Sequence, residues 1–344
     1  MLGTNIGIDL GTTSIVIYVQ DKGVVLNEPS VAACDAKTGR MLATGYKAYE
    51  MLGRNPASVK VVRPLKDGVV SDFSVIQSMM IYYLQKICGN KIFKPNVIIC
   101  TPSSVTELEK RTLLDLATAS GAGRACLIEE PLAAAIGSGI DISRPSGSFV
   151  VDIGGGTTDI AVITMGSIAI SKSIKTAGNA FDEAIVRHMR RERNLLIGEV
   201  TAEDIKKKIG CAYLRDEELA VGVKGKNYIT GMPSFFEISS TEVYLAMREQ
   251  IENIGDAVKS VLEMTPPEMS ADISEKGIYL TGGGALLRGM DIMVNRKTKI
   301  ETIVSKDPIN CVANGMGKVL KDLDILLDNG YIFKTREEIT GYDE

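Results

Sequence analysis

The fold is decided by two stretches that share one pattern, Asn5-Ile-Gly-Ile-Asp-Leu-Gly-Thr-Thr-Ser14 and Phe149-Val-Val-Asp-Ile-Gly-Gly-Gly-Thr-Thr-Asp159. In each, an apolar run leads to an aspartate and a glycine- and threonine-rich turn, and a second apolar run follows, at Ile15–Val19 and Ile160–Met165. This order predicts two β-hairpins. Their aspartates, Asp9 and Asp152, lie in equivalent places 143 positions apart (152 − 9). Two similar units at this separation predict two related α/β domains that face each other across a cleft.

The glycine-rich turns are the candidate phosphate sites. Glycine leaves backbone N–H groups unshielded, so that successive amides can surround phosphate oxygens, and neighbouring hydroxyl groups add donors. One Gly-Thr turn alone is most often only a turn, but two matched copies favour nucleotide binding. The candidate residues are Gly11, Thr12, Thr13 and Ser14 in the first hairpin, and Gly154, Gly155, Gly156, Thr157 and Thr158 in the second.

The aspartate that precedes each turn predicts a metal ion. A carboxylate beside a phosphate is repelled by it unless a cation lies between them. Mg²⁺ is the usual cation in phosphate sites, and it commonly keeps several of its waters. The two hairpins therefore predict ATP with Mg²⁺, and Asp9 and Asp152 would hold the ion through water.

A third glycine cluster, Gly282, Gly283 and Gly284, follows the predicted strand Ile278–Leu280. Bare glycines would let a flat adenine or a ribose lie against the backbone. Alone, the cluster would favour a tight strand-to-helix turn. Beside two phosphate hairpins, it predicts the nucleoside side of the cleft.

Glu130 is the candidate for the chemical step. It follows the apolar strand Cys126–Ile128 and precedes Pro131, a residue that suits the first turn of a helix. A glutamate at such a strand-to-helix junction can face a cleft, where it would position or deprotonate an attacking water. The neighbouring Glu129 has a purely structural explanation, because an acidic residue at the start of a helix interacts favourably with the helix dipole.

Composition limits the function classes. The chain has 344 residues, 45% of them hydrophobic, which favours two domains over one. The net charge of −4 gives no sign of nucleic-acid binding by bulk electrostatics. His188 is the single histidine, which argues against a Ser-His-Asp triad or a multi-histidine zinc site. The six cysteines form no CxxC pair and predict buried thiols in a reducing compartment. We expect a cytoplasmic protein, since no signal peptide or spanning apolar run is visible.

We place the domain boundary near residue 142, in the polar stretch Asp141-Ile-Ser-Arg-Pro-Ser-Gly147. One helix is predicted from a capping box at Ser104 and Glu107 to about residue 120. Another is predicted from about Ser240 to just before Thr265, and Thr201 is expected to cap a third, mostly solvated helix.

Taken together, these segments resemble the actin, sugar kinase and heat-shock chaperone superfamily, and within it the bacterial MreB/Mbl family. The resemblance covers about residues 3 to 320. It rests on Ile6-Gly-Ile-Asp-Leu-Gly-Thr12, Asn27-Glu-Pro-Ser30, Arg63-Pro-Leu-Lys-Asp-Gly68, Leu127-Ile-Glu-Glu-Pro131, Val151-Asp-Ile-Gly-Gly-Gly-Thr-Thr158, Thr265-Pro-Pro-Glu268 and Tyr279-Leu-Thr-Gly-Gly-Gly284.

The resemblance implies an α/β, actin-like ATPase fold, with two related RNase H-like domains around a nucleotide cleft. Domain I would comprise residues 1–142, with 315–344 returning to it and a small subdomain at about 30–70. Domain II would comprise 143–314, with a small subdomain at about 180–245. By position, Glu130 would be the hydrolytic glutamate, Thr157 would help to orient the water, Glu203 and Lys206 would contact adenine and ribose, and Gly178 would lie near the nucleotide.

The resemblance also implies an ATP-dependent, membrane-associated filament that determines cell shape. Its partners would be other copies of itself, the inner face of the cell membrane and membrane proteins of cell-wall elongation. Membrane contact would come from an exposed loop at Ile92 and Phe93, although ordinary loop packing explains this pair equally well. The chain departs from the family pattern at Ser14, where Asn is usual, and at Asn179, where Asp is usual.

Two other functions remain open. A small-molecule kinase of the same superfamily would need a catalytic base for a substrate hydroxyl, and the sequence offers no separate site for one. A non-polymerising protein that binds ATP, with or without hydrolysing it, is compatible with every motif above.

Overall fold

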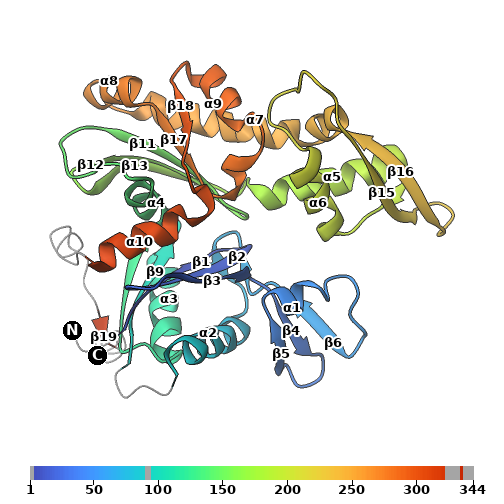
Figure 1. Ribbon diagram of the computed structural model, residues 1–344, viewed down its shortest axis with the longest axis horizontal. Coiled ribbons are helices and arrows are strands. Elements are labelled where there is room, and N and C mark those ends of the chain that lie inside the picture. The colour runs from blue at the N-terminus through green and yellow to red at the C-terminus, as the bar shows by residue number, and fades with distance from the viewer. Residues whose placement is uncertain (1–3, 90–93, 322–333, 336–344) are drawn as a thin grey trace.

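The computed structural model describes residues 4–89, 94–321 and 334–335. It contains two α/β halves, one above the other in Figure 1, and each half carries a smaller unit on the same side of the molecule. The predicted membrane residues Ile92 and Phe93 lie outside the described residues.

The first half is built on a six-stranded sheet. Its central strands are apolar and buried, because the sheet is covered on both faces. Helices α2 (Phe73–Cys88) and α3 (Glu107–Ala119) belong to this half. In sheet order, the strands are β19 (Lys334–Thr335), β10 (Arg124–Glu129), β9 (Asn96–Thr101), β1 (Asn5–Leu10), β2 (Ser14–Val19) and β3 (Gly23–Pro29).

The second half repeats this arrangement in a five-stranded sheet. An antiparallel hairpin is again extended by an antiparallel strand on one side and by parallel strands on the other, so β3-β2-β1-β9-β10 corresponds to β13-β12-β11-β17-β18. The strands are β11 (Ser148–Ile153), β12 (Thr158–Thr164), β13 (Ser167–Ile174), β17 (Ile278–Thr281) and β18 (Thr302–Val304). The prediction of two related α/β units from the paired hairpins is therefore confirmed.

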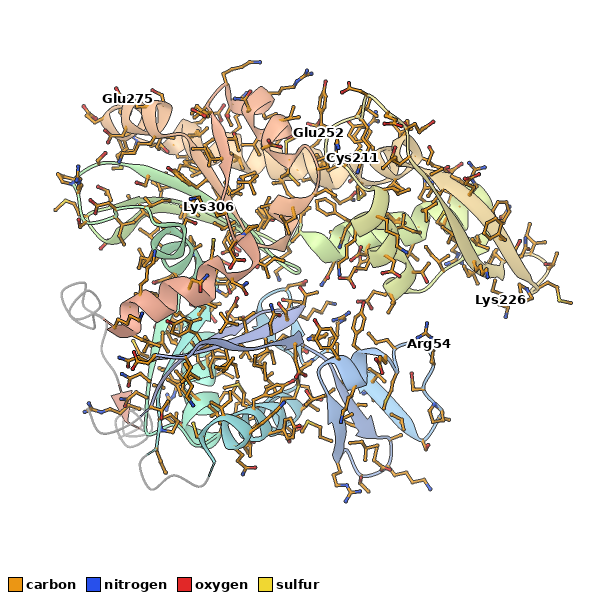
Figure 2. All side chains as sticks on the ribbon, in the orientation of Figure 1. Arg54, Cys211, Lys226, Glu252, Glu275 and Lys306 are labelled. Carbon is orange, nitrogen blue, oxygen red and sulfur yellow. The ribbon has the colours of Figure 1, made fainter. Side chains whose placement is uncertain are left out.

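Each half carries a smaller unit. The first contains β4 (Ala32–Asp35), β5 (Met41–Thr44), α1 (Tyr46–Tyr49) and β6 (Val59–Val62), followed by the short hairpin of β7 (Leu65–Lys66) and β8 (Val69–Val70). The second contains α5 (Gly178–Arg193), β14 (Leu195–Leu196), α6 (Glu199–Ile209), β15 (Ala220–Asn227) and β16 (Pro233–Ser239). Arg54 and Lys226 mark these two units in Figure 2. The domain limits given above stay a prediction.

The long helix α7 (Ser240–Met264) follows the predicted pattern. Ser239 caps it by accepting a hydrogen bond from the Glu242 N–H, and its apolar side chains face the core of the second half. It is followed by α8 (Pro267–Lys276), the short helix η1 (Gly283–Leu286), α9 (Met290–Thr298) and the short helix η2 (Pro308–Asn310).

Two predicted helix starts are wrong. The capping box of α3 is formed by Thr106 and Glu109, not by Ser104 and Glu107, because the Thr106 side chain and the Glu109 carboxylate exchange hydrogen bonds with each other's backbone N–H groups. Thr201 caps nothing, since α6 already begins at Glu199.

Helices α4 (Glu130–Ser138) and α10 (Cys311–Lys321) cross between the two sheets. The crossing is close because each helix presents a glycine to the backbone of the other. A Cβ atom on Gly137 would overlap the carbonyl oxygen of Cys311, and one on Gly315 would overlap that of Ala133. Residues 311–321 thus return to the first half, where α10 also packs against β1 and β2.

Two composition-based expectations are testable in the fold. Cys34, Cys100, Cys126, Cys211 and Cys311 are buried free thiols, as predicted, whereas the sixth cysteine, Cys88, is only partly buried. In the part of the chain that the structure describes, we find no helix with the length and apolar character needed to span a bilayer.

Candidate nucleotide site

The two glycine-rich turns have the same geometry. In the first, the Gly11 N–H donates to the Ser14 carbonyl oxygen at 3.0 Å, and in the second the Gly154 N–H donates to the Thr157 carbonyl oxygen at 2.9 Å. Each bond closes the turn directly after the aspartate-bearing strand. The repeated sequence pattern therefore produces a repeated backbone turn, one in each half of the molecule.

The two turns meet face to face. The Thr13 side chain lies against Gly155, where an added Cβ atom would overlap it, and the Thr12 side chain lies against Gly156. Only glycine allows this approach. The structure thus brings together the turns that were predicted to bind phosphate, although they are 143 positions apart in the chain (154 − 11).

Four carboxyl groups gather behind these turns. Asp9 and Asp152 lie near the ends of β1 and β11, Glu130 begins α4, and Asp159 lies on β12, directly opposite Asp152 in the strand pairing. Burial and then the charge of Asp152 raise the pKa of Asp9 to about 7. Burial also raises the pKa of Asp152 to about 7, although a hydrogen bond from the Thr281 hydroxyl at 2.7 Å opposes this shift. These groups are costly to ionise together without a cation.

Glu130 has the most perturbed environment of the predicted catalytic residues. Its pKa is raised well above the usual value by burial, and further by the charges of Asp159, Asp9 and Asp152, in that order. Thr157 is buried at the second turn and reaches the short β7–β8 hairpin, where it lies beside Gly68. The side chains predicted to act on water are therefore close to the carboxylate cluster.

The chemistry of this donor set fits a hydrated Mg²⁺ ion. A divalent cation would relieve the mutual repulsion of Asp9, Asp152 and Glu130, and oxygen ligands are those that Mg²⁺ prefers. Within residues 4–89, 94–321 and 334–335, no three potential ligand side chains converge closely enough to hold an ion by themselves. The metal role of the two aspartates stays a prediction.

Helix α5 supports the second turn from behind. The N–H groups of Gly178 and Asn179 donate to the carbonyl oxygens of Gly154 and Gly155, at 3.1 and 2.8 Å. Gly178 thus lies against the second turn, and its predicted place near the nucleotide stays a prediction. These two amides are already engaged, so that Gly178 would act by shaping the turn.

Lys206 and Glu203 on α6 are held by protein partners. The Lys206 ammonium group donates to the Gly178 carbonyl oxygen at 2.9 Å and to the Asp182 carboxylate at 2.7 Å. Glu203 accepts a hydrogen bond from the hydroxyl of Tyr49, which belongs to the opposite half, and pairs with Lys207. Burial opposes ionisation of Glu203, but these hydrogen bonds outweigh it and lower its pKa. Both side chains are therefore near the second turn or at the boundary between the halves.

The third glycine cluster packs on the end of β11. Gly282 has a φ of 77°, and a Cβ atom there would lie 2.8 Å from a carboxylate oxygen of Asp152. Gly284 contacts Ile153, whereas Gly283 has no atom within 4 Å of its missing side chain. The cluster therefore leaves an open backbone surface beside the aspartate, as the prediction of a nucleoside contact requires.

One of the residues predicted to bind phosphate, Thr158, has its hydroxyl group engaged elsewhere in the protein. The Thr158 hydroxyl is fully buried and donates to the Thr176 carbonyl oxygen at 2.7 Å. Because Thr158 is the first residue of β12, its side chain points away from that of Thr157. Its hydroxyl is thus not available to a phosphate.

Sequence reasoning missed four contributors to the site, which are Thr281, Gly68, Ser103 and Asp159. Thr281 bonds to Asp152, the Gly68 N–H donates to the Thr12 hydroxyl at 3.0 Å, and the Ser103 N–H donates to Asp159 at 3.1 Å. Asp159 had a visible signal: in the first hairpin the equivalent position, opposite Asp9, is Val16. Since the first hairpin forms with valine at this position, the hairpin fold does not require a carboxylate there.

The chain is similar to known proteins over nearly its whole length. Residues 3–328 match the MreB/Mbl protein family. The cell shape-determining protein Mbl of Bacillus cereus is 46% identical over 329 residues, 95% of this chain and 98% of that protein. The cell shape-determining protein MreB of Escherichia coli K12 is 44% identical over 331 residues, 94% and 95% of the two chains.

Solved structures give the same result. MreB5 of Spiroplasma citri bound to ADP superimposes with a TM-score of 0.91 at 38% identity, over 96% of this chain and 99% of that one. The MamK double helical filament, at 22% identity and a TM-score of 0.80, shares the fold.

Two mixed-strand α/β halves whose glycine-rich hairpins face each other define an actin-like protein, and the predicted fold class is confirmed. Within that class, the chain belongs to the MreB/Mbl family. The roles predicted for individual site residues stay predictions.

Proposed function

We propose that this chain binds ATP with Mg²⁺ between its two hairpins, hydrolyses it slowly, and forms membrane-associated filaments that determine cell shape by organising cell-wall elongation. The observation that carries the proposal is the contact between two glycine turns of matching geometry, each of which follows a strand that carries an aspartate near its end. Spiroplasma citri MreB5, which is 38% identical, has been solved with ADP and with AMPPNP, which supports nucleotide binding by this chain.

The residues would divide the work as follows. Backbone amides and hydroxyls of the two turns would bind the phosphates, and Gly282–Gly284 would accommodate the nucleoside. Bound Mg²⁺ would supply positive charge between Asp9, Asp152 and the phosphates. Glu130 would accept a proton from the attacking water. Burial and the neighbouring carboxylates raise the pKa of Glu130, and a higher pKa makes a carboxylate a stronger base.

Self-assembly and a role in cell shape are supported by relatives. Mbl of Bacillus cereus and MreB of Escherichia coli are both named cell shape-determining proteins, and MamK, which shares the fold, forms a double helical filament. We expect light scattering to rise when ATP and Mg²⁺ are added to the purified chain. Absence of scattering and of polymer in electron micrographs, across a range of salt and lipid conditions, would contradict the filament proposal.

Hydrolysis is tested separately from assembly. Glu130→Ala removes the proposed base, so phosphate release should fall by about 10²-fold or more while ATP still binds. Glu129→Ala, next to it in sequence, is the matched control and should keep phosphate release. If Glu130→Ala releases phosphate at the wild-type rate, a scaffold that binds ATP without using Glu130 replaces this proposal.

Membrane contact is proposed at Ile92 and Phe93, with Lys91 and Lys94 flanking them in the sequence. Two apolar side chains insert weakly, but a filament presents many copies at once, so the individual affinities combine. In a pelleting assay with liposomes that contain anionic lipid, the double variant Ile92→Ser, Phe93→Ser should stay in the supernatant. Pelleting equal to that of the wild type would exclude this loop as the anchor.

A further inference from the structure

A groove lies at one end of the first sheet, between its strands and the end of α2. It consists of two adjoining clefts of about 430 and 390 Å³, which share Lys22 and Ile87. The first cleft follows residues 25–28 of β3, and the second reaches Thr4 and Asn5 at the beginning of β1. The groove therefore runs from the outer edge of the sheet to the N-terminal end of a central strand.

The surface of this groove is partly apolar and mainly basic. Val25 and Tyr46, which line the first cleft, are 40% and 59% exposed. Two acids, Asp21 and Glu28, also line the groove, and the Glu28 carboxylate is 4.0 Å from the Lys86 ammonium group, too far for a hydrogen bond. Four exposed basic residues lie along the groove or near the first residues of β9 and β10: Lys22, Lys86, Lys94 and Arg124. This excess of positive charge favours an acidic occupant.

The chain itself brings an acidic segment to this end of the sheet. Thr335, the last residue of β19, pairs with Arg124 of β10, and the same row continues through β9 to Asn5 of β1. Because β19 runs antiparallel to β10, the chain leaves β19 at the end of the sheet where the groove lies. Three strand spacings, or about 14 Å, separate Thr335 from Asn5.

The segment that follows Thr335 is Arg-Glu-Glu-Ile-Thr-Gly-Tyr-Asp-Glu, residues 336–344, which lie outside the described residues. It carries four acidic side chains and one basic side chain, the opposite balance to that of the groove. An extended chain covers about 3.3 Å per residue, so about four residues would reach Asn5 and the others could follow the groove. The segment therefore matches the groove in charge and in reach.

We propose that residues 336–344 dock in this groove. Tyr342 would pack on the apolar surface, and the two acids that follow it would pair with Lys22 and Lys86. Exposed ion pairs are weak, but the segment belongs to the same chain, so its effective concentration at the groove is high.

The test uses Tyr342→Trp in the full chain, which has no other tryptophan. In nucleotide-free buffer at low salt, docking should shield this side chain from acrylamide. Adding Lys22→Glu and Lys86→Glu should raise the quenching constant by about threefold, because both ion pairs are replaced by repulsion. Quenching that is the same with and without the two substitutions would overturn the proposal.

Two further variants show whether the effect is specific. Lys224→Glu with Lys226→Glu, at exposed positions on β15 of the other half, is the matched control and should leave quenching unchanged. Asp343→Lys with Glu344→Lys, added to the reversed groove, should restore the shielding, because the charges are complementary again. Failure of this rescue would overturn the pairing. So would shielding that disappears when the protein is diluted, because the groove would then hold the segment of a second copy.

Docking has a consequence at the membrane, and this part rests on the proposed membrane contact. Lys94 flanks the proposed membrane residues Ile92 and Phe93, so an acidic segment docked nearby would weaken the attraction to anionic lipid. A chain that stops at Thr335 should therefore pellet with anionic liposomes more than the full chain does. If neither chain pellets, the proposed membrane contact fails, whereas docking is decided by the quenching of Trp at position 342. Equal pelleting of the two chains would overturn the shielding of the membrane surface.

Discussion

Asp182 and Lys206 show how a single ion pair behaves next to the site. Asp182 is buried on α5 and accepts from Lys206 at 2.7 Å, yet its other oxygen has no partner among the described residues. Burial raises its pKa to about 6, even though the Lys206 charge acts in the opposite direction. The pair therefore orients Lys206 rather than adding stability at neutral pH.

This pKa shift predicts a pH dependence of unfolding. Because the folded pKa of Asp182 is higher than the unfolded value of 3.8, its contribution to stability is full below pH 4 and is lost as the pH rises to about 6. The loss is about 3 kcal/mol, from the size of the shift. Asp182→Asn removes the titrating carboxyl group and with it this pH dependence. In urea unfolding, the free energy of unfolding of the variant should therefore rise relative to that of the wild type between pH 4 and 6. Parallel pH profiles would contradict the assignment.

Individual site residues could be predicted where the chemistry lies within one motif. Asp9, Asp152 and the turn glycines were found because each hairpin contains its own aspartate and turn. Thr281 and Ser103 were missed because their contacts depend on which strands and loops become neighbours. Likewise, the hydrogen bond from Tyr49 to Glu203 joins residues 154 positions apart, and no local pattern records it.

Among the elements, the crossing of α4 and α10 between the two sheets is a contact of backbone against backbone. Gly137 and Gly315 each touch the backbone of the opposite helix, so that no flexible side chain is present to move aside. Helix propensity alone would favour alanine over glycine at both positions. The packing reverses that preference.

We therefore expect Gly315→Ala to destabilise the protein by about 3 kcal/mol or more, because the new methyl group would overlap the Ala133 carbonyl oxygen. Thermal melting would measure the effect. The control is Gly198→Ala at the start of α6, where no atom lies within 4 Å of the added Cβ and a loss below about 1 kcal/mol is expected. Equal losses in the two variants would show that the crossing is not as tight as described.

The sequence predicted the helices and strands more completely than it predicted the contacts of individual site residues. Alternating and helical apolar patterns located the main strands and α7, because those patterns arise from burial on one face. The start of α3 was misplaced, since two Ser/Thr-x-x-Glu patterns overlap there and only the backbone geometry selects between them. The α4–α10 crossing could not be foreseen, because it joins helices from distant parts of the chain.

In the whole molecule, as far as the structure describes it, two side-chain contacts to α6 join the two smaller units across the boundary. The Tyr49 hydroxyl donates to Glu203, and the Arg63 guanidinium group pairs with Glu199. Both donors come from the smaller unit of the first half. Since Glu203 is also a predicted nucleoside contact, closure of the molecule and occupation of the site involve the same side chain.

Removing both contacts should shift the molecule toward an open state. In Tyr49→Phe, Arg63→Gln, the loss of one hydrogen bond and one partly exposed ion pair, together about 1–3 kcal/mol, should speed release of a fluorescent ATP analogue by about tenfold. Stopped-flow displacement would measure the rate. Arg54→Gln, on the same smaller unit and exposed, is the control and should leave release unchanged. An unaltered rate in the double variant would mean that these contacts do not limit opening.

The glycine crossing also has a mechanical consequence. Because no side chain separates α4 from α10 at these glycines, we expect any rotation of one half against the other to have its axis close to the two helices. Displacement grows with distance from such an axis, as along a lever arm. The β15–β16 hairpin, marked by Lys226 in Figure 2, lies at the far end of the molecule from the crossing. A small rotation that barely alters the contacts of Gly137 and Gly315 would therefore displace the tip of this hairpin by a much larger distance.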